Sequence, residues 1–235
     1  MNFKSVEFPR RIRSYVRRDG RMTEAQRLAY EENLPQFGLA IENNKIDLEK
    51  TFARNAPTIL EIGFGSGQSL LAMAIEHPEY NCIGVETYLP GIGAVLLGMQ
   101  RRKINNIRLY HADAVEVLEK CIPENSLACI QIFFPDPWPK RKHHKRRLIQ
   151  LEFIELVASR LMSDGILHLA TDWEHYAEHM MKVLSSSTSI INLVGENQFA
   201  DRSEHRPIIT KFEQRGIKHG RKIWELQFAK NKVTS

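Results

Sequence analysis

The sequence has few cysteines and no long apolar segment. Cys82, Cys121 and Cys129 are its only cysteines, and none of them forms a CxxC pair. An odd number of widely spaced cysteines supports neither a disulfide framework nor a zinc site, so we expect no metal. No apolar run approaches the roughly 18 to 20 residues needed to cross a bilayer, and arginines stand near the N-terminus where a secretory signal would be apolar. These absences predict a cytoplasmic protein with no membrane partner.

The positive charge of the chain is clustered. Of 33 Lys and Arg side chains, six lie within residues 10–21 and six within residues 140–147. Clustered charge creates a local field that can neutralise several phosphates, although one cluster alone could also be a solvated face. Two such clusters in one chain favour a nucleic-acid partner.

Apolar runs alternate with helical stretches from residue 58 onward, and 43% hydrophobic content over 235 residues suits one α/β domain. Strands are expected at 58–62, 81–85, 107–111, 127–134, 166–170 and 222–228. Helices are expected at 69–76, 91–102, 148–162 and 175–184. This alternation predicts a doubly wound, parallel sheet. Residues 51–235 are expected to form this α/β domain, and residues 1–50 a basic, partly flexible N-terminal extension. Within the extension, a helix is expected to begin after its cap, Thr23.

A glycine-rich turn follows the first expected strand. In Glu61-Ile62-Gly63-Phe64-Gly65-Ser66-Gly67, the glycines Gly63, Gly65 and Gly67 permit positive φ and a close approach of the backbone to a ligand. A dinucleotide fingerprint would need a further small residue where Gln68 stands, so a pyrophosphate cofactor fits poorly. A tight turn that only packs a strand on a helix is the alternative.

Three acids stand at the ends of successive strands. Glu61 could meet an ammonium group, Glu86 could accept hydrogen bonds from both hydroxyls of a ribose, and Asp113 could accept from an adenine amino group. The set matches S-adenosylmethionine, which is cationic and carries a ribose but no phosphate; a phosphorylated cofactor would be repelled. Each acid alone could instead be a helix cap or a surface charge.

Residues 135–147 place an acid and an indole in a proline-rich turn directly before the second basic cluster. Proline fixes φ, so Pro135, Pro137 and Pro139 hold Asp136 and Trp138 in an extended or turn geometry. An acid beside a phosphate-binding segment indicates chemistry on a nucleic-acid base. The indole could stack on that base or anchor the turn.

Taken together, these motifs resemble the bacterial-type tRNA (guanine-N7-)-methyltransferase family. The likeness rests on the glycine turn, on Pro135-Asp136-Pro137-Trp138-Pro139-Lys140 with its basic tail, on Thr171-Asp172-Trp173 and on Thr210-Lys211-Phe212-Glu213. It runs from about residue 14 to the C-terminal strand. The resemblance implies a Rossmann-like class I methyltransferase with an antiparallel C-terminal strand, which methylates guanine N7 in the variable loop of tRNA.

The resemblance also implies roles for single residues. Asp136 would be the active-site acid, with some contact to the cofactor. Cofactor contacts are expected from Glu61, Gly63, Gly65, Gly67, Glu86, Asp113 and Asp136. Substrate contacts are expected from Lys140, Asp172, Thr210, Lys211, Phe212 and Glu213, the last four in a polar loop that would otherwise be taken for a helix start. Contacts to RNA are expected from Lys142, His143, His144, Lys145, Arg146 and Arg147.

The chemistry of guanine N7 agrees with this set. N7 carries a free lone pair, so no general base is needed and the enzyme can work chiefly by positioning. Methylation leaves the purine cationic, and a carboxylate of Asp136 or Asp172 would stabilise that charge. The alternatives are an amino-methyltransferase acting on adenine or a protein side chain, and a tRNA-binding module without activity. Both a monomer and a homodimer are compatible with the apolar helical faces.

Overall fold

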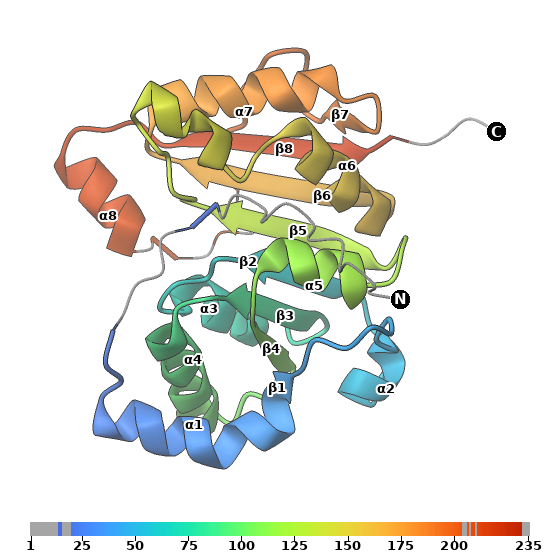
Figure 1. Cartoon of the computed structure of the whole chain (residues 1–235), viewed down its shortest axis with the longest axis vertical. Coiled ribbons are helices and arrows are strands. Elements are labelled where there is room, and N and C mark those ends of the chain that lie inside the picture. Colours follow the sequence, from blue (N-terminus) through green and yellow to red (C-terminus); the bar gives the residue numbers. More distant parts are fainter. Residues whose placement is uncertain (1–13, 16–19, 204–205, 207, 210, 232–235) are drawn as a thin grey trace, which may run out of the picture.

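In the described part of the chain, eight strands form one sheet with helices on both faces (Figure 1). The computed structural model describes residues 14–15, 20–203, 206, 208–209 and 211–231. The strand order is β1-β4-β3-β2-β5-β6-β8-β7. The strands are β1 Gly38–Leu39, β2 Thr58–Ile62, β3 Asn81–Glu86, β4 Ile107–His111, β5 Leu127–Phe133, β6 Leu161–Thr171, β7 Ile190–Asn192 and β8 Trp224–Lys230. Strands β1 to β6 pair in parallel, and β8 is antiparallel to both β6 and β7.

The connections between the strands are mostly helical. The helices are α1 Glu24–Phe37, α2 Leu48–Phe52, α3 Gln68–Glu76, α4 Leu89–Arg102, α5 Ala114–Lys120, α6 Leu151–Arg160, α7 Glu174–Ser186 and α8 Lys211–Lys218, with a 3-10 helix, η1, at Arg141–Arg146. Among the described helices, none is both long and apolar enough to cross a membrane.

The central strands supply two apolar cores, one on each face of the sheet. Leu60 and Ile62 of β2 belong to a core with α5, α6 and α7, whereas Ile59 belongs to a core with α1, α3 and α4. Successive side chains of a strand point to opposite faces, so a strand covered on both faces is apolar along its whole length. All five residues of β2 are buried, which is why this strand was visible in the sequence.

The predicted doubly wound sheet is confirmed, but the boundary between α6 and β6 was predicted wrongly. The helix expected at 148–162 spans only Leu151–Arg160, and β6 begins at Leu161. Leu161 pairs with Leu127, while Ile166 pairs with Cys129, so the residues between them form an irregularity in the ladder. Asp164, with a φ of 61°, lies inside this bulge and does not end a helix.

Part of the expected N-terminal extension packs against the sheet. The helix α1 begins at the predicted cap, where Thr23 and Gln26 form a reciprocal capping box, and it lies against α4. Gly93 of α4 permits this approach, because a Cβ there would lie 3.1 Å from the backbone oxygen of Gln26. The strand β1 then joins the sheet beside β4. The domain boundary at residue 50 stays a prediction, but α1 and β1 are in contact with the α/β core.

We expect Thr23→Ala to lower the free energy of unfolding of the whole domain by about 1 kcal/mol, because a cap is lost from a helix packed on the core. Denaturant unfolding followed by circular dichroism measures the change, and Thr23→Ser, which keeps the hydroxyl, is the control. An unchanged midpoint for Thr23→Ala would mean that α1 behaves as an appendage.

Candidate active site

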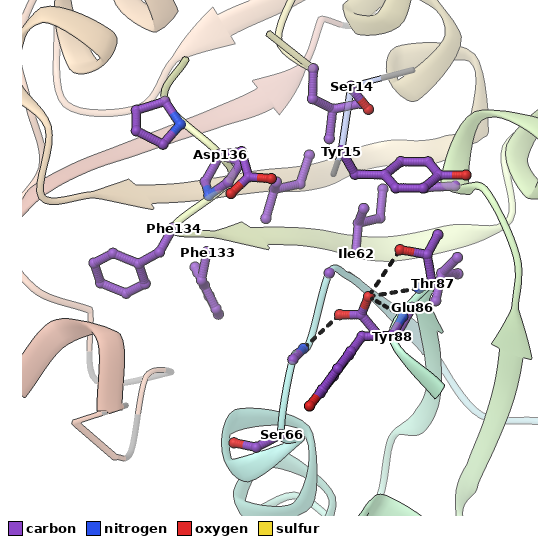
Figure 2. Close-up of a pocket in the computed structure, with 18 of the residues that line it drawn as sticks. Ser14, Tyr15, Ile62, Ser66, Glu86, Thr87, Tyr88, Phe133, Phe134 and Asp136 are labelled. Atoms are coloured by element: carbon purple, nitrogen blue, oxygen red, sulfur yellow. Dashed lines mark hydrogen bonds between the residues drawn. The ribbon is translucent and has the colours of Figure 1, made fainter. Parts of the chain in front are cut away.

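A cavity of about 830 Å³ opens at the carboxyl ends of the central parallel strands (Figure 2). Its walls come from the segments that follow β2, β3, β4, β5 and β6 and from the segment that precedes β8, together with Ser14 and Tyr15. Doubly wound sheets bind ligands at this edge, where the connections on either side of the switch point diverge. The volume suits a ligand the size of a nucleoside.

The three glycines of the turn after β2 have two roles, lining the cavity and allowing close helix packing. Gly63, Gly65 and Gly67 have φ values of 73°, 57° and 74°. Gly63 and Gly65 line the cavity, and a Cβ built at Gly63 would meet no atom within 4 Å. At Gly67 a Cβ would lie 2.0 Å from Cγ2 of Val95. The first two predicted cofactor glycines therefore face the cavity, whereas Gly67 allows α3 and α4 to pack closely.

The Glu86 carboxylate joins the glycine turn to the end of β3. Its Oε2 accepts a hydrogen bond from the backbone N–H of Gly65 at 2.8 Å, and its Oε1 accepts from those of Thr87 at 2.6 Å and Tyr88 at 2.9 Å (Figure 2). The side chain also lines the cavity. The backbone of two loops thus holds this predicted cofactor acid in position.

Glu61 is buried next to the cavity without forming part of its wall. The residue is 3% exposed, and its Oε2 has no hydrogen-bond partner among the described residues. Burial, and then the negative charge of Glu86, raise the pKa of Glu61 to about 8. A buried carboxyl with an unsatisfied oxygen is unfavourable unless a partner is supplied. The ammonium group of a ligand would be such a partner, so this position fits the amino-acid end of S-adenosylmethionine.

Asp113 caps a helix and lines the cavity at the same time. Its Oδ1 accepts a hydrogen bond from the backbone N–H of Val115 at 2.9 Å, at the start of α5. The helix-cap alternative is therefore observed, and the cap orients the same side chain at the cavity wall.

The proline turn after β5 places Asp136 in the wall of the cavity (Figure 2). Phe134 and Trp138, on either side of it, have φ values of 52° and 44°. Residues other than glycine rarely adopt such values, so the surrounding structure must impose this backbone shape. The turn therefore positions Asp136 at the edge of the sheet where the glycine turn also ends.

Trp138 is held by other groups of the protein. Its Nε1 donates to the backbone oxygen of Ser14 at 2.9 Å. The guanidinium of Arg146 lies 3.8 Å from the ring centroid, and the His143 ring stacks at 5.8 Å. These contacts favour the anchoring role over stacking on a base. Through Ser14 they also hold a short N-terminal segment, Ser14 and Tyr15, at the cavity, which sequence reasoning did not assign to the site.

The 3-10 helix η1 carries exposed positive charge beside the proline turn. Lys140, Lys142 and Lys145 are exposed, whereas His143 and His144 are partly buried. Desolvation and the neighbouring charges, Lys142 first, lower the pKa of His143, so at neutral pH this ring offers hydrogen bonds and no charge. These three lysines and the equally exposed Arg141 are the side chains of this segment best placed to meet phosphates.

Arg147 requires a correction to the predicted set of RNA contacts. The residue is 2% exposed, and its Nε donates to the backbone oxygen of Pro137 at 3.0 Å. Its guanidinium lies 4.8 Å from the ring centroid of Tyr176. A buried arginine in these contacts holds the proline turn against α7 and is not accessible to a phosphate.

Asp172, a predicted substrate contact, lines the cavity and is paired with an arginine that sequence reasoning missed. Arg221 Nη1 donates to Oδ2 of Asp172 at 2.8 Å, and Arg221 and His219 themselves line the cavity. No motif marks these two residues in the sequence. Their neighbourhood with Asp172 arises because β8 returns antiparallel beside β6.

The predicted substrate segment 210–213 leads into a helix, so the expected loop is wrong and the helix-start alternative is observed. Thr210 lies outside the described residues, and of Lys211 and Phe212 only the backbone is described. Glu213 is 2% exposed and pairs with Arg206 at 2.6 Å and Arg202 at 3.2 Å, away from the cavity wall. Substrate contacts by these four residues stay predictions.

Solved structures with the same fold include methyltransferases that act on RNA or confer antibiotic resistance. The 16S rRNA methyltransferase KamB aligns with a TM-score of 0.58 over 80% of this chain and 95% of its own, at 11% identity. The aminoglycoside resistance methyltransferase NpmB1 aligns with a TM-score of 0.53 over 78% and 92%, at 12% identity. A family model described as "Putative methyltransferase" matches residues 55–226. The fold and the site together define a class I, Rossmann-like methyltransferase.

Curated relatives are similar over nearly the whole chain. The tRNA (guanine-N(7)-)-methyltransferase of Idiomarina loihiensis is 48% identical over 238 residues, covering 98% of this chain and 97% of the relative. The enzyme of the same name from Alcanivorax borkumensis is 49% identical over 221 residues, covering 94% and 92%. The chain belongs to the tRNA (guanine-N(7)-)-methyltransferase family. This confirms the family resemblance found in the motifs.

Because the pKa of Glu61 is raised, its contribution to stability is present at acid pH and is lost as pH rises from about 4.5 to about 8. We therefore expect Glu61→Gln, a neutral isostere, to be more stable than the wild type at pH 8 by on the order of 2 kcal/mol, and to approach it near pH 5. Thermal unfolding of both proteins from pH 5 to 9 measures this difference. A difference that did not change with pH would contradict the burial of a protonated Glu61.

The double substitution Lys142→Ala/Lys145→Ala should weaken tRNA binding and reduce the slope of log K against log salt by about 1 to 2, because up to two phosphate contacts are lost. Filter binding at several salt concentrations measures the slope. Arg101→Ala/Arg102→Ala removes the same charge from the exposed C-terminal end of α4, at the opposite edge of the sheet, and is the matched control. Equal losses from both variants would show that η1 acts only through net charge.

Proposed function

We propose that this chain transfers a methyl group from S-adenosylmethionine to N7 of guanine in the variable loop of tRNA. The observation that carries the proposal is that Asp136 shares one cavity with Gly63, Gly65, Glu86 and Asp113. The acid assigned to the reaction and the residues assigned to the cofactor were far apart in the sequence. Their meeting in one cavity supports a site in which donor and acceptor are held together.

The residues of this chain fit S-adenosylmethionine at each of its ends. Glu61 would accept from the ammonium group, and Glu86 from the ribose hydroxyls, with its backbone hydrogen bonds keeping the carboxylate in place. Asp113 would accept from the adenine amino group at the end of β4. When bound, the cofactor supplies an electrophilic methyl group on its sulfonium.

Asp136 would act by position and charge, because guanine N7 needs no deprotonation before it attacks. Its carboxylate, in the wall of the cavity, would accept from N1–H and N2–H of guanine and stabilise the positive charge that the purine gains. Asp172 is balanced by Arg221 at 2.8 Å, so we assign Asp172 to orienting the base and Asp136 to stabilising its charge. The exposed lysines of η1 would bring the tRNA backbone to this acid.

The alternative function is that of an amino-methyltransferase, whose product would carry the methyl group on an exocyclic nitrogen. Incubation with bulk tRNA and labelled cofactor, followed by borohydride and aniline treatment, separates the two functions, because 7-methylguanosine makes the strand cleavable. We expect cleavage at one guanine of the variable loop. Labelled tRNA without cleavage would overturn the proposal, and unlabelled tRNA together with no binding of the cofactor would favour a binding module.

Asp136→Asn should reduce turnover by at least about 100-fold, because the carboxylate charge is lost from the transition state while the shape of the turn is kept. Single-turnover methylation of tRNA measures the rate, and calorimetry with S-adenosylmethionine measures cofactor affinity, which should change only a few-fold. Loss of cofactor binding would instead assign Asp136 to holding the cofactor.

A further inference from the structure

Arg206 is a buried cation that joins α8 to the sheet behind the cavity. The residue is 3% exposed, and its Nη2 donates to Oε1 of Glu213 in α8 at 2.6 Å. Its Nε lies 3.0 Å from Oε1 of Glu225 in β8. The other oxygen of Glu225 lies 2.6 Å from Nε2 of His168 in β6. The guanidinium therefore bridges α8 and β8, and Glu225 extends the connection to His168 of β6.

The same guanidinium packs against the strand end that carries Asp136. Its central carbon lies 5.3 Å from the ring centroid of Phe133 and 5.5 Å from that of Phe134. Both phenylalanines line the cavity, and Asp136 follows Phe134 by two residues. The Phe133 ring also meets His168 edge to face, with centroids 5.0 Å apart. Arg206 thus contacts the base of the proline turn as well as α8.

The far end of α8 reaches the rim of the cavity. A Cβ built at Gly216 would lie 3.0 Å from Cβ of Asp172, so only a glycine allows this approach without a shift. The backbone N–H of Arg221 donates to the oxygen of Gly216 at 3.0 Å, and the Arg221 side chain pairs with Asp172. A displacement of α8 would therefore move the Asp172–Arg221 pair at the cavity rim.

From these contacts we propose that Arg206 is a positioning residue that fixes α8, and with it the Asp172–Arg221 pair, relative to Asp136. The inference rests on the proposed function, because it assigns the α8 side of the cavity to the guanine of the tRNA. A planar guanidinium can meet two carboxylates and two ring faces at once, whereas a lysine ammonium cannot. Buried ion pairs add little net stability after desolvation. In this protein the role of the two pairs is to fix α8 relative to β8.

The test compares Arg206→Lys and Arg206→Met with the matched variants Arg160→Lys and Arg160→Met. Arg160 is also a buried arginine, 7% exposed, with its Nε donating to the backbone oxygen of Leu118 at 2.9 Å, but it precedes β6 at the opposite edge of the sheet. The measurements are kcat and KM for tRNA, the Kd for S-adenosylmethionine, and the midpoint of thermal unfolding. Both pairs remove a buried guanidinium, so a purely structural role predicts the same outcome for both.

We expect the Arg206 variants to lose about 100-fold in kcat/KM for tRNA, because a small displacement of the reacting groups costs a factor of this size. The Kd for S-adenosylmethionine should stay within about twofold of wild type. The Arg160 variants should be less stable but keep the kinetic constants. If Arg206→Met does not fold, Arg206→Lys decides by the same comparison. Equal kinetic losses at both positions, or an unchanged kcat/KM in the Arg206 variants, would overturn the inference.

A double variant separates this inference from a direct contact of Glu213 with the substrate. If Glu213 acts through Arg206, Glu213→Gln should cause a similar loss, and Arg206→Met/Glu213→Gln should lose no more than either single variant. Losses that multiply would mean that Glu213 acts on its own and would overturn the inference. A wild-type protein that makes no 7-methylguanosine would contradict the proposed function itself, whatever the Arg206 variants show.

Discussion

The parallel pairing of β2 with β3 on one side and β5 on the other is the constraint on which the site depends. Parallel strands bring the residues that follow them to one edge of the sheet. The glycine turn, Glu86 and Asp136 therefore meet at that edge. In the sequence, Glu61 and Asp136 are 75 residues apart. The hydrogen bond from Gly65 to Glu86 then joins two of these segments directly. The rest of the cavity is built around that edge.

Negative and positive side chains occupy different parts of the site, according to the charge of the group that each part would bind. Acids line or adjoin the cavity, where they suit a cationic cofactor and a purine that becomes cationic. The exposed lysines of η1 lie outside it, where they suit phosphates. Buried arginines take a third role, since Arg147 holds the proline turn and Arg206 joins α8 to the sheet. A basic residue next to a nucleic-acid site is thus not always a nucleic-acid contact, and burial distinguishes the cases.

Prediction from the sequence succeeded where a local pattern has one structural meaning. The strand β2 was placed at its observed bounds because it is buried on both faces, and Thr23 was recognised as a cap because its hydroxyl serves a local hydrogen bond. The start of β6 could not be placed, because Asp164-Gly165 suits a helix end as well as a bulge. Arg221 was missed because nothing in its own segment marks it, and its partner Asp172 lies 49 residues away.

The sequence by itself determined the fold class, the family and the chemical types gathered at the site, because these depend on periodicity and on short motifs in a fixed order. Only the tertiary structure decided which members of each motif face the cavity: Gly63 and Gly65 line it while Gly67 packs against α4, and Glu213 is buried between arginines. Orientation and burial depend on contacts between segments distant in the chain, and local sequence carries no measure of those contacts.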